Sequence, residues 1–261
     1  MRLFYLILLF YLFVACNNVN RQAGEFIRDS IIASNSTDTS ILIYTEGLEK
    51  IKDALDIKES CVYTSGDYSF YFVKAEKDSV PVFYKEIGDN GEYGFNYKTY
   101  YLQDNNLVLF TEKSKVKNAG ANKSYEYKET RTFFRNGVFL KEEQRIAESD
   151  SLLNETPFTK LDENIGNKNP QYDFQRIQNA VAEIGEFDLR FDRLQVLGPS
   201  KTYLIMHNNE RNLESSYLIK KPDSLIIKIK EQPETFKDKS LKIDYKKEGM
   251  LMIYNGGKLR K

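Results

Sequence analysis

The sequence predicts an α+β protein, built mainly of antiparallel β meanders that are each preceded by an amphipathic helix. Two series of short segments rich in aromatic and β-branched residues, separated by Gly, Asp and Asn turn clusters, predict the meanders. An apolar stripe at helical spacing precedes each series. With 261 residues, of which 41% are hydrophobic, the chain is long enough to bury a sizeable core.

The first half begins with a short helix and continues as strands. Leu48, Ile51 and Leu55 recur at i, i+3 and i+7, which predicts a helix over about residues 46–57 after a polar loop at 35–40. Asn136-Gly137 lies between two apolar runs and tolerates the positive φ angles of a type I′ turn, which predicts a hairpin. The other predicted strands of this half are 68–73, 80–84, 93–102 and 107–111.

The second half repeats this order of elements. Asn169 is the predicted cap of a helix that starts at Pro170 and ends at Gly185. Six predicted strands follow, at 194–196, 203–206, 216–219, 225–229, 241–245 and 251–254. The shared order permits a duplication, although Asn-Gly hairpins also recur for purely geometric reasons.

Composition divides the chain into five segments. The polar, weakly apolar stretch after the hairpin is the best candidate for a domain boundary. The segments are a signal peptide (1–15), a lipidated tether (16–24), an N-terminal α+β unit (25–148), a linker (149–168) and a C-terminal α+β unit (169–261).

Charge and rare residues exclude several classes of function. The 38 basic and 38 acidic side chains give a formal net charge of +0, which argues against nucleic acid as a partner. One His excludes a His-rich metal site, and 2 Cys exclude a disulfide-dense scaffold. No phosphate loop, dinucleotide fingerprint or nucleophile elbow occurs. We therefore assign no catalytic residue, metal ligand or cofactor from the sequence.

The N-terminus carries the clearest targeting signal. Arg2 precedes an unbroken apolar run from Leu3 to Ala15, which is shorter than the roughly 20 residues of a spanning helix and is typical of a secretory signal. Residues 12–16, Leu-Phe-Val-Ala-Cys, resemble the lipobox of bacterial lipoproteins. Phe13 stands where Leu or Val is usual, as in the looser boxes of Bacteroidota and spirochaetes. The alternative for Cys16 is a plain thiol after an ordinary signal or an uncleaved helix.

The resemblance to lipoproteins implies cleavage before Cys16, acylation of that residue and attachment to the outer membrane of a Gram-negative cell. Stable attachment requires more than one acyl chain. Residues 17–20 lack the acidic run that resembles a surface-export signal in Bacteroidota, so the periplasmic face is slightly favoured. Four Asp-Ser-aliphatic triplets also resemble the O-glycosylation signal of Bacteroidota; their serines are Ser30, Ser79, Ser151 and Ser224.

Cys61 and His207 are two single residues with side chains suited to catalysis. Cys61 opens an apolar run and is better explained as a small buried hydrophobe than as a nucleophile, because no His lies near it in sequence. His207 at a predicted strand end is better explained as a half-exposed turn residue than as a general base. The adjacent pair Glu142-Glu143 is badly placed for glycoside cleavage, because neighbouring strand residues face opposite sides.

The sequence therefore predicts a membrane-anchored envelope lipoprotein that acts as a non-enzymatic binding or assembly component. Its 18 Tyr and 17 Phe either fill the core or offer a stacking surface to an envelope protein or glycan. The alternatives are a carboxylate-dependent envelope hydrolase, which needs two converging carboxylates, and a lipid or lipoprotein carrier, which needs a continuous apolar cavity.

Overall fold

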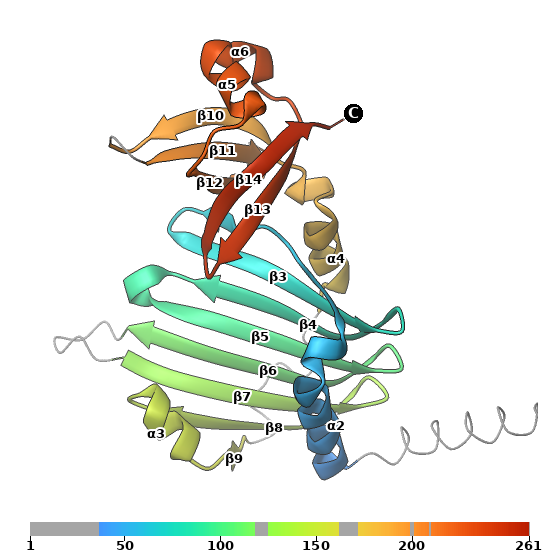
Figure 1. The fold of residues 1–261 in the computed structure, drawn as a ribbon. Helices are drawn as coiled ribbons and strands as arrows, with labels where there is room; N and C mark the ends of the chain where they lie inside the picture. The colour runs from blue at the N-terminus through green and yellow to red at the C-terminus, as the bar shows by residue number, and fades with distance from the viewer. Residues whose placement is uncertain (1–36, 118–124, 162–171, 199–200, 209, 261) are drawn as a thin grey trace, which may run out of the picture.

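The computed structural model describes residues 37–117, 125–161, 172–198, 201–208 and 210–260. Within these ranges the strands join one 14-stranded sheet, antiparallel except where β14 runs parallel to β12 (Figure 1). The protein is therefore mainly antiparallel β with a few helices, which agrees with the α+β prediction in outline.

The elements follow one another in this order. The N-terminal part contains α2 (Asp38–Lys50), η1 (Lys52–Ala54), β1 (Asp56–Glu59), β2 (Tyr63–Ser65), β3 (Tyr68–Lys77), β4 (Val80–Asp89), η2 (Gly91–Tyr93), β5 (Gly94–Gln103), β6 (Asn106–Lys117), β7 (Tyr125–Arg135), β8 (Val138–Ala147), α3 (Asp150–Glu155) and β9 (Thr159–Lys160). The remainder contains α4 (Phe174–Ala182), η3 (Gly185–Phe187), β10 (Arg190–Val196), β11 (Thr202–Asn208), β12 (Leu213–Ile219), α5 (Ser224–Glu231), α6 (Pro233–Phe236), β13 (Leu241–Glu248) and β14 (Leu251–Leu259).

Strands β3 to β8 form the long meander of the first half, in which each strand pairs with the next. The predicted hairpin between β7 and β8 is confirmed. Asn136 and Gly137 both adopt positive φ angles, 49° and 73°, as a type I′ turn requires. The segment at 149–168, which the sequence predicts as a linker, contains α3 and the two residues of β9 that pair with β8.

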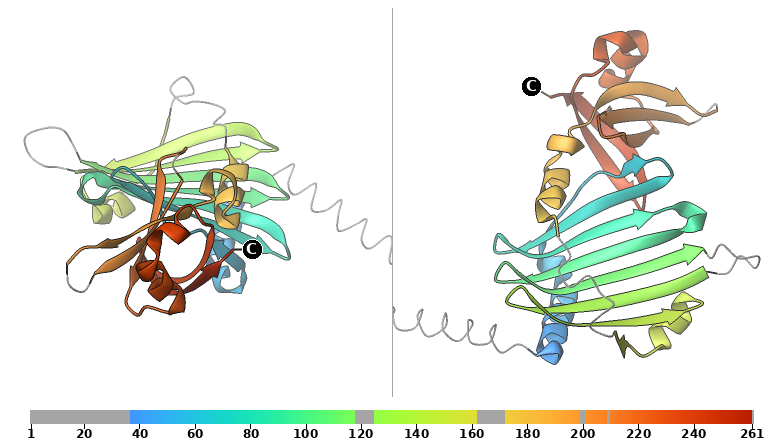
Figure 2. Two further views of the ribbon diagram at one scale, coloured as in Figure 1. Left: turned by 90° about the horizontal axis from the view of Figure 1, so that it is seen from above. Right: turned by 180° about the vertical axis from the view of Figure 1, so that it is seen from behind.

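The second half extends the same sheet. Strands β10, β11 and β12 pair in sequence, and β12 reaches β2 through a bridge between Glu214 and Thr64. Strand β14 lies parallel to β12 and pairs on its other side with β13. The views from above and behind in Figure 2 show the second half stacked on the β3 end of the meander.

Two helices cover opposite faces of the meander. Helix α2 crosses its strands on one side in Figure 1, and α4 lies on the other side in the rear view of Figure 2. We call these the α2 face and the α4 face. The α2 face buries Phe83, Tyr101, Leu109 and Phe133, among others, beneath α2. The core of the α4 face continues into the second half, so both halves share one hydrophobic cluster.

Helix α2 begins earlier than the sequence predicts. Thr37 caps it, because its hydroxyl accepts a hydrogen bond from Ser40 N at 3.2 Å. Its buried residues are Ile41, Thr45 and Leu48. Residues 38–40 of the predicted loop at 35–40 therefore lie in the helix, and the predicted extension to residue 57 is wrong. The cap at Thr37 starts the helix within a segment whose composition is typical of a loop. The helix does not reach residue 57, because β1 pairs with β3 from Asp56 onward.

Helix α4 begins at Phe174 and is capped by Asp173. The predicted cap, Asn169, lies outside the described residues. The helix ends at Ala182, and Glu183 follows in the left-handed region with a φ of 54°. The first residue of η3 is Gly185, which also has a positive φ. The predicted end of this helix at Gly185 therefore agrees with the structure to within three residues.

The predicted strand at 225–229 is wrong, because these residues lie in α5. Asp223 caps that helix, and its Oδ1 accepts a hydrogen bond from Ile226 N at 3.0 Å. Leu225, Ile226 and Ile229 are buried on one face of the helix. The β-branched composition suggested a strand, but the cap and the helical spacing of the buried residues prevail.

Candidate functional site

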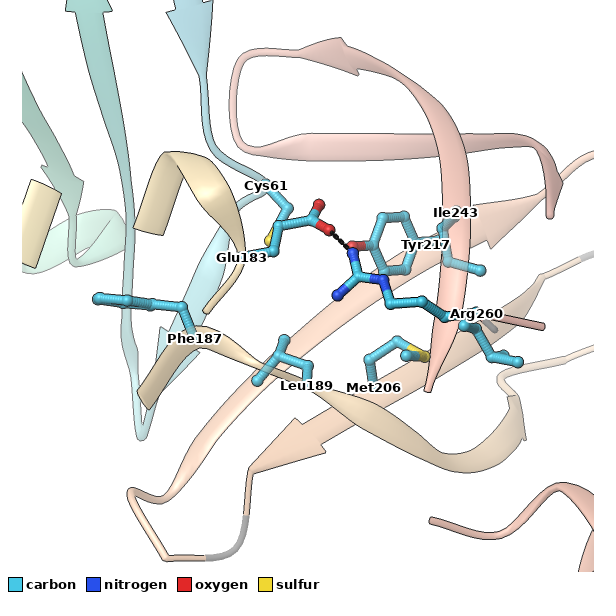
Figure 3. A pocket seen from close by; sticks show the side chains of 9 residues that line it. Cys61, Glu183, Phe187, Leu189, Met206, Tyr217, Ile243 and Arg260 are labelled. Atoms are coloured by element: carbon cyan, nitrogen blue, oxygen red, sulfur yellow. Dashed lines mark hydrogen bonds and ion pairs between the residues drawn. The ribbon is translucent and has the colours of Figure 1, made fainter. Parts of the chain in front are cut away.

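The pocket at the junction of the two halves is too small for a ligand. Cys61, Glu183, Tyr217 and Arg260 are among its lining residues, and they come from both halves of the chain (Figure 3). Its volume of about 20 Å³ holds about one water molecule. Glu183 and Arg260 form an ion pair of 2.5 Å beside it. We interpret this pocket as a small packing gap where the two halves of the chain meet.

Cys61 and His207 do not form a catalytic pair in this structure. Cys61 is buried, and burial raises the pKa of its thiol, which opposes formation of the nucleophilic thiolate. His207 Nε2 lies 3.2 Å from Asp238 Oδ1. This geometry agrees with the interpretation of Cys61 as a buried hydrophobe. His207 is more buried than the sequence predicts, at 8% exposure.

A much larger groove lies between α2 and neighbouring strands of the α2 face. Its volume of about 510 Å³ lies within the range of roughly 300–1,000 Å³ typical of small-molecule sites. Helix α2 contributes Leu42, Thr45, Glu46, Glu49 and Lys50, and the sheet contributes Tyr101, Leu109, Thr111, Glu129 and Arg131. Both charge signs and two aliphatic side chains therefore line one groove.

Arg131 supplies a positive charge to the sheet wall of this groove. Its guanidinium lies 3.8 Å from the ring centroid of Phe158, and its Nε lies 4.0 Å from Glu129 Oε1. Burial lowers the pKa of the Arg131 guanidinium, but arginine stays charged in proteins. Glu129 is itself engaged, because its Oε2 accepts from Arg145 Nε at 2.8 Å. Arg131 can therefore donate hydrogen bonds to a ligand.

Glu49 joins the helix to the sheet at one wall of the groove. Its Oε1 accepts from Tyr101 Oη at 2.8 Å and from Lys85 Nζ at 3.0 Å. Burial by itself would raise the pKa of Glu49, but the hydrogen bonds from Lys85 and Tyr101 outweigh it and keep the pKa below its ordinary value. Burial also raises the pKa of Tyr101, so the phenol stays a donor.

Glu49 is poorly suited to act as a general acid. A general acid needs a raised pKa so that it holds its proton near neutral pH. Lys85 and Tyr101 instead keep the pKa of Glu49 below its ordinary value. Glu142 and Glu143 lie on opposite faces, as the sequence predicts. Glu142 lines a recess on the α4 face, whereas Glu143 pairs with Lys141, which also pairs with Asp38 of α2.

The sequence-predicted modification residues are dispersed. Cys16 and Ser30 lie outside the described residues. Ser79 is exposed in the β3–β4 turn, Ser151 in α3, and Ser224 at the start of α5. The three described serines are therefore far apart in the fold and belong to no common site.

The sequence analysis missed the groove. Its charged residues come from α2 and β7, which only the fold brings together. One feature of the sequence points to the groove. Arg131 and the core residue Phe133 are two residues apart on one strand, so the charge of Arg131 faces the same side as the core.

In the ranges that the structure describes, no group of three or more His, Cys, Asp or Glu side chains could hold a metal ion. No described helix is long and apolar enough to cross a membrane. Comparison of the chain with protein families, curated proteins and solved structures found no match.

Proposed function

We propose that this protein is a lipid-anchored component of the cell envelope whose folded body binds a partner without catalysis. The N-terminal resemblance to lipoprotein signals supports the anchor at Cys16. We further propose that the body consists of two α+β units, each a helix followed by an antiparallel meander. Outer-membrane attachment, with the periplasmic face favoured, completes the proposal.

The observation that carries the binding role is the groove between α2 and the α2 face. Its walls offer a fixed cation at Arg131, carboxylates at Glu46 and Glu49, and aliphatic contacts at Leu42 and Leu109. A protein segment bearing both charge signs would match these walls. The ring of Phe158 and the packing of α2 hold the charged groups before any partner arrives, which reduces the ordering cost of binding.

The two alternatives find less support in the same groove. A hydrolase would need a protonated carboxyl beside an ionised one, whereas Glu49 is held ionised by Lys85 and Tyr101. A lipid carrier would need walls that are apolar throughout, whereas charged side chains line both sides of this groove. We therefore retain the binding role.

Site-specific photo-cross-linking in intact cells tests the proposal. A photoreactive amino acid replaces exposed Lys50 at the rim of the groove, and a matched variant carries it at exposed Lys220 in the second half. We expect one dominant envelope protein to be captured from position 50 and not from position 220. Equal capture at both positions, or none, would contradict a binding role for the groove.

The anchor is tested separately by metabolic labelling with palmitate. We expect the intact chain to incorporate the label and Cys16→Ser to lose both label and membrane association. Undiminished labelling of the variant would refute the assignment of Cys16.

A further inference from the structure

The α4 face of the meander contains a second recess that the proposed function does not use. Its volume is about 390 Å³, again within the small-molecule range. Neighbouring strands supply its floor, where Phe110 pairs with Thr132 and Glu112 with Thr130. It lies on the opposite side of the sheet from the α2 groove, because Thr130 and Thr132 alternate with the groove residue Arg131.

Two threonine hydroxyls line the floor of this recess. Thr130 and Thr132 are only 8% and 5% exposed, and neither side chain forms a hydrogen bond with the described residues. Their hydroxyl oxygens are not fully buried, so they remain open to the recess. Two hydroxyls without a protein partner can therefore exchange hydrogen bonds with a polar occupant.

The wall formed by β5 adds another unsatisfied acceptor. Asn96 Nδ2 donates to Glu112 Oε1 at 2.8 Å, which leaves the buried Asn96 Oδ1 without a hydrogen-bond donor. Glu142, on the far side of the floor, forms no ion pair within the described part of the chain. The recess is therefore rich in hydrogen-bond acceptors and suits a ligand with several hydrogen-bond donors.

An aromatic ring borders these acceptors. Phe110 is partly exposed, and its ring stacks on Tyr100 with centroids 5.0 Å apart and an interplanar angle of 26°. The ring of Tyr172 lies 5.4 Å away and holds Phe110 from another side. Phe110 is thus a fixed apolar plane beside hydroxyls, an amide and carboxylates.

We propose that the recess on the α4 face binds a sugar ring, and that it prefers an amino sugar. The C–H face of the ring packs on Phe110, while its hydroxyls donate to Asn96 Oδ1, Glu112 and the threonine floor. Glu112 and Glu142 together carry two negative charges against one positive charge on Lys128, which favours an ammonium substituent.

Ligand-observed NMR on the full-length chain tests this proposal, in a detergent whose headgroup is not a sugar. The probes are glucosamine, galactosamine and glucose. The binding variant is Thr130→Val/Thr132→Val, which removes the unpaired hydroxyls and keeps their shape. Because those hydroxyls lose no protein partner, we expect the variant to keep its Tm. The matched control is Thr99→Val in β5, which pairs with Thr111 and therefore lies on the opposite face of the sheet from the recess.

We expect at least one amino sugar to bind more tightly than glucose. Sugar binding should weaken about tenfold or more in the double variant and stay unchanged in Thr99→Val. Glu142→Gln should reduce the preference for the amino sugar over glucose. Failure of all three sugars to bind, or an equal loss of binding in Thr99→Val, would overturn the proposal. The test is independent of the lipid anchor and of the α2 groove.

Discussion

The cap of α5 offers the sharpest test of how the second half is held together. Asp223 Oδ1 accepts from Ile226 N at 3.0 Å, while its Oδ2 accepts from Tyr254 Oη at 2.9 Å and from Gly257 N at 3.3 Å. One carboxylate therefore caps the helix and ties it to β14. Asp173 provides a matched comparison, because it caps α4 through Arg176 N.

We expect Asp223→Ala to cost more than Asp173→Ala in free energy of unfolding. Loss of an N-cap costs about 0.5–2 kcal/mol. Asp223→Ala also removes the acceptor of Tyr254 and Gly257, at about 1 kcal/mol for each lost hydrogen bond. The expected costs are therefore about 2–4 kcal/mol for Asp223→Ala and about 1 kcal/mol for Asp173→Ala.

Urea unfolding followed by circular dichroism measures both changes in the free energy of unfolding. The comparison requires that the slope of this free energy against urea concentration is the same in all variants. A cycle with Tyr254→Phe isolates the tie to β14. Two results together would refute the reasoning. Asp223→Ala and Asp173→Ala would lower the free energy of unfolding equally, and the effects of Asp223→Ala and Tyr254→Phe would simply add in the double variant.

The same carboxylate predicts a dependence on pH. Burial by itself would raise the pKa of Asp223, but hydrogen bonds from Ile226 N, Tyr254 and Gly257 N outweigh it and lower the pKa. The unfolded chain therefore takes up the proton first as the pH falls, so this contribution is full above about pH 4 and is lost as the pH falls through the lower pKa of the folded state. The difference in stability between the intact chain and Asp223→Ala should shrink below about pH 4.

Two further predictions concern single positions. Gly94 has a φ of 142°, and a Cβ there would lie 1.8 Å from the backbone oxygen of Lys115; Gly94→Ala should therefore destabilise the protein by at least about 1–3 kcal/mol, and an unchanged Tm would contradict this. Cys61 is buried with a raised pKa, so in the Cys16→Ser variant it should react with a thiol reagent only as fast as the protein opens. Rapid labelling under native conditions would show that the thiol is accessible.

Local signals in the sequence were sufficient for much of the fold. Asn136-Gly137 determines its hairpin through the φ angles of two adjacent residues, so no distant contact is needed. The strand assigned to residues 225–229 failed because isoleucine favours strands in general, whereas the cap at Asp223 acts at this particular position. The start of α2 was missed for the same reason, because a single cap at Thr37 decides it.

The candidate sites depend on contacts that no local pattern reveals. The α2 groove combines Glu49 with Arg131, and the recess combines Asn96 with Thr132; in each case the partners are separated by whole strands. The alternation along β7 showed that Arg131 and Thr132 face opposite sides. It could not show which elements cover those sides, because that depends on the packing of α2 and α4.

The junction between β2 and the second half has a consequence for the order of folding. Ser215 Oγ donates to Val62 O across 153 residues, and Val62 N lies 3.2 Å from the sulfur of Met252 across 190 residues. Each hairpin of the meander joins strands that are close in sequence, whereas this junction forms only after β12 and β14 have been synthesised. A chain that emerges N-terminus first therefore exposes the apolar segment around Val62 until β12 and β14 pack against it.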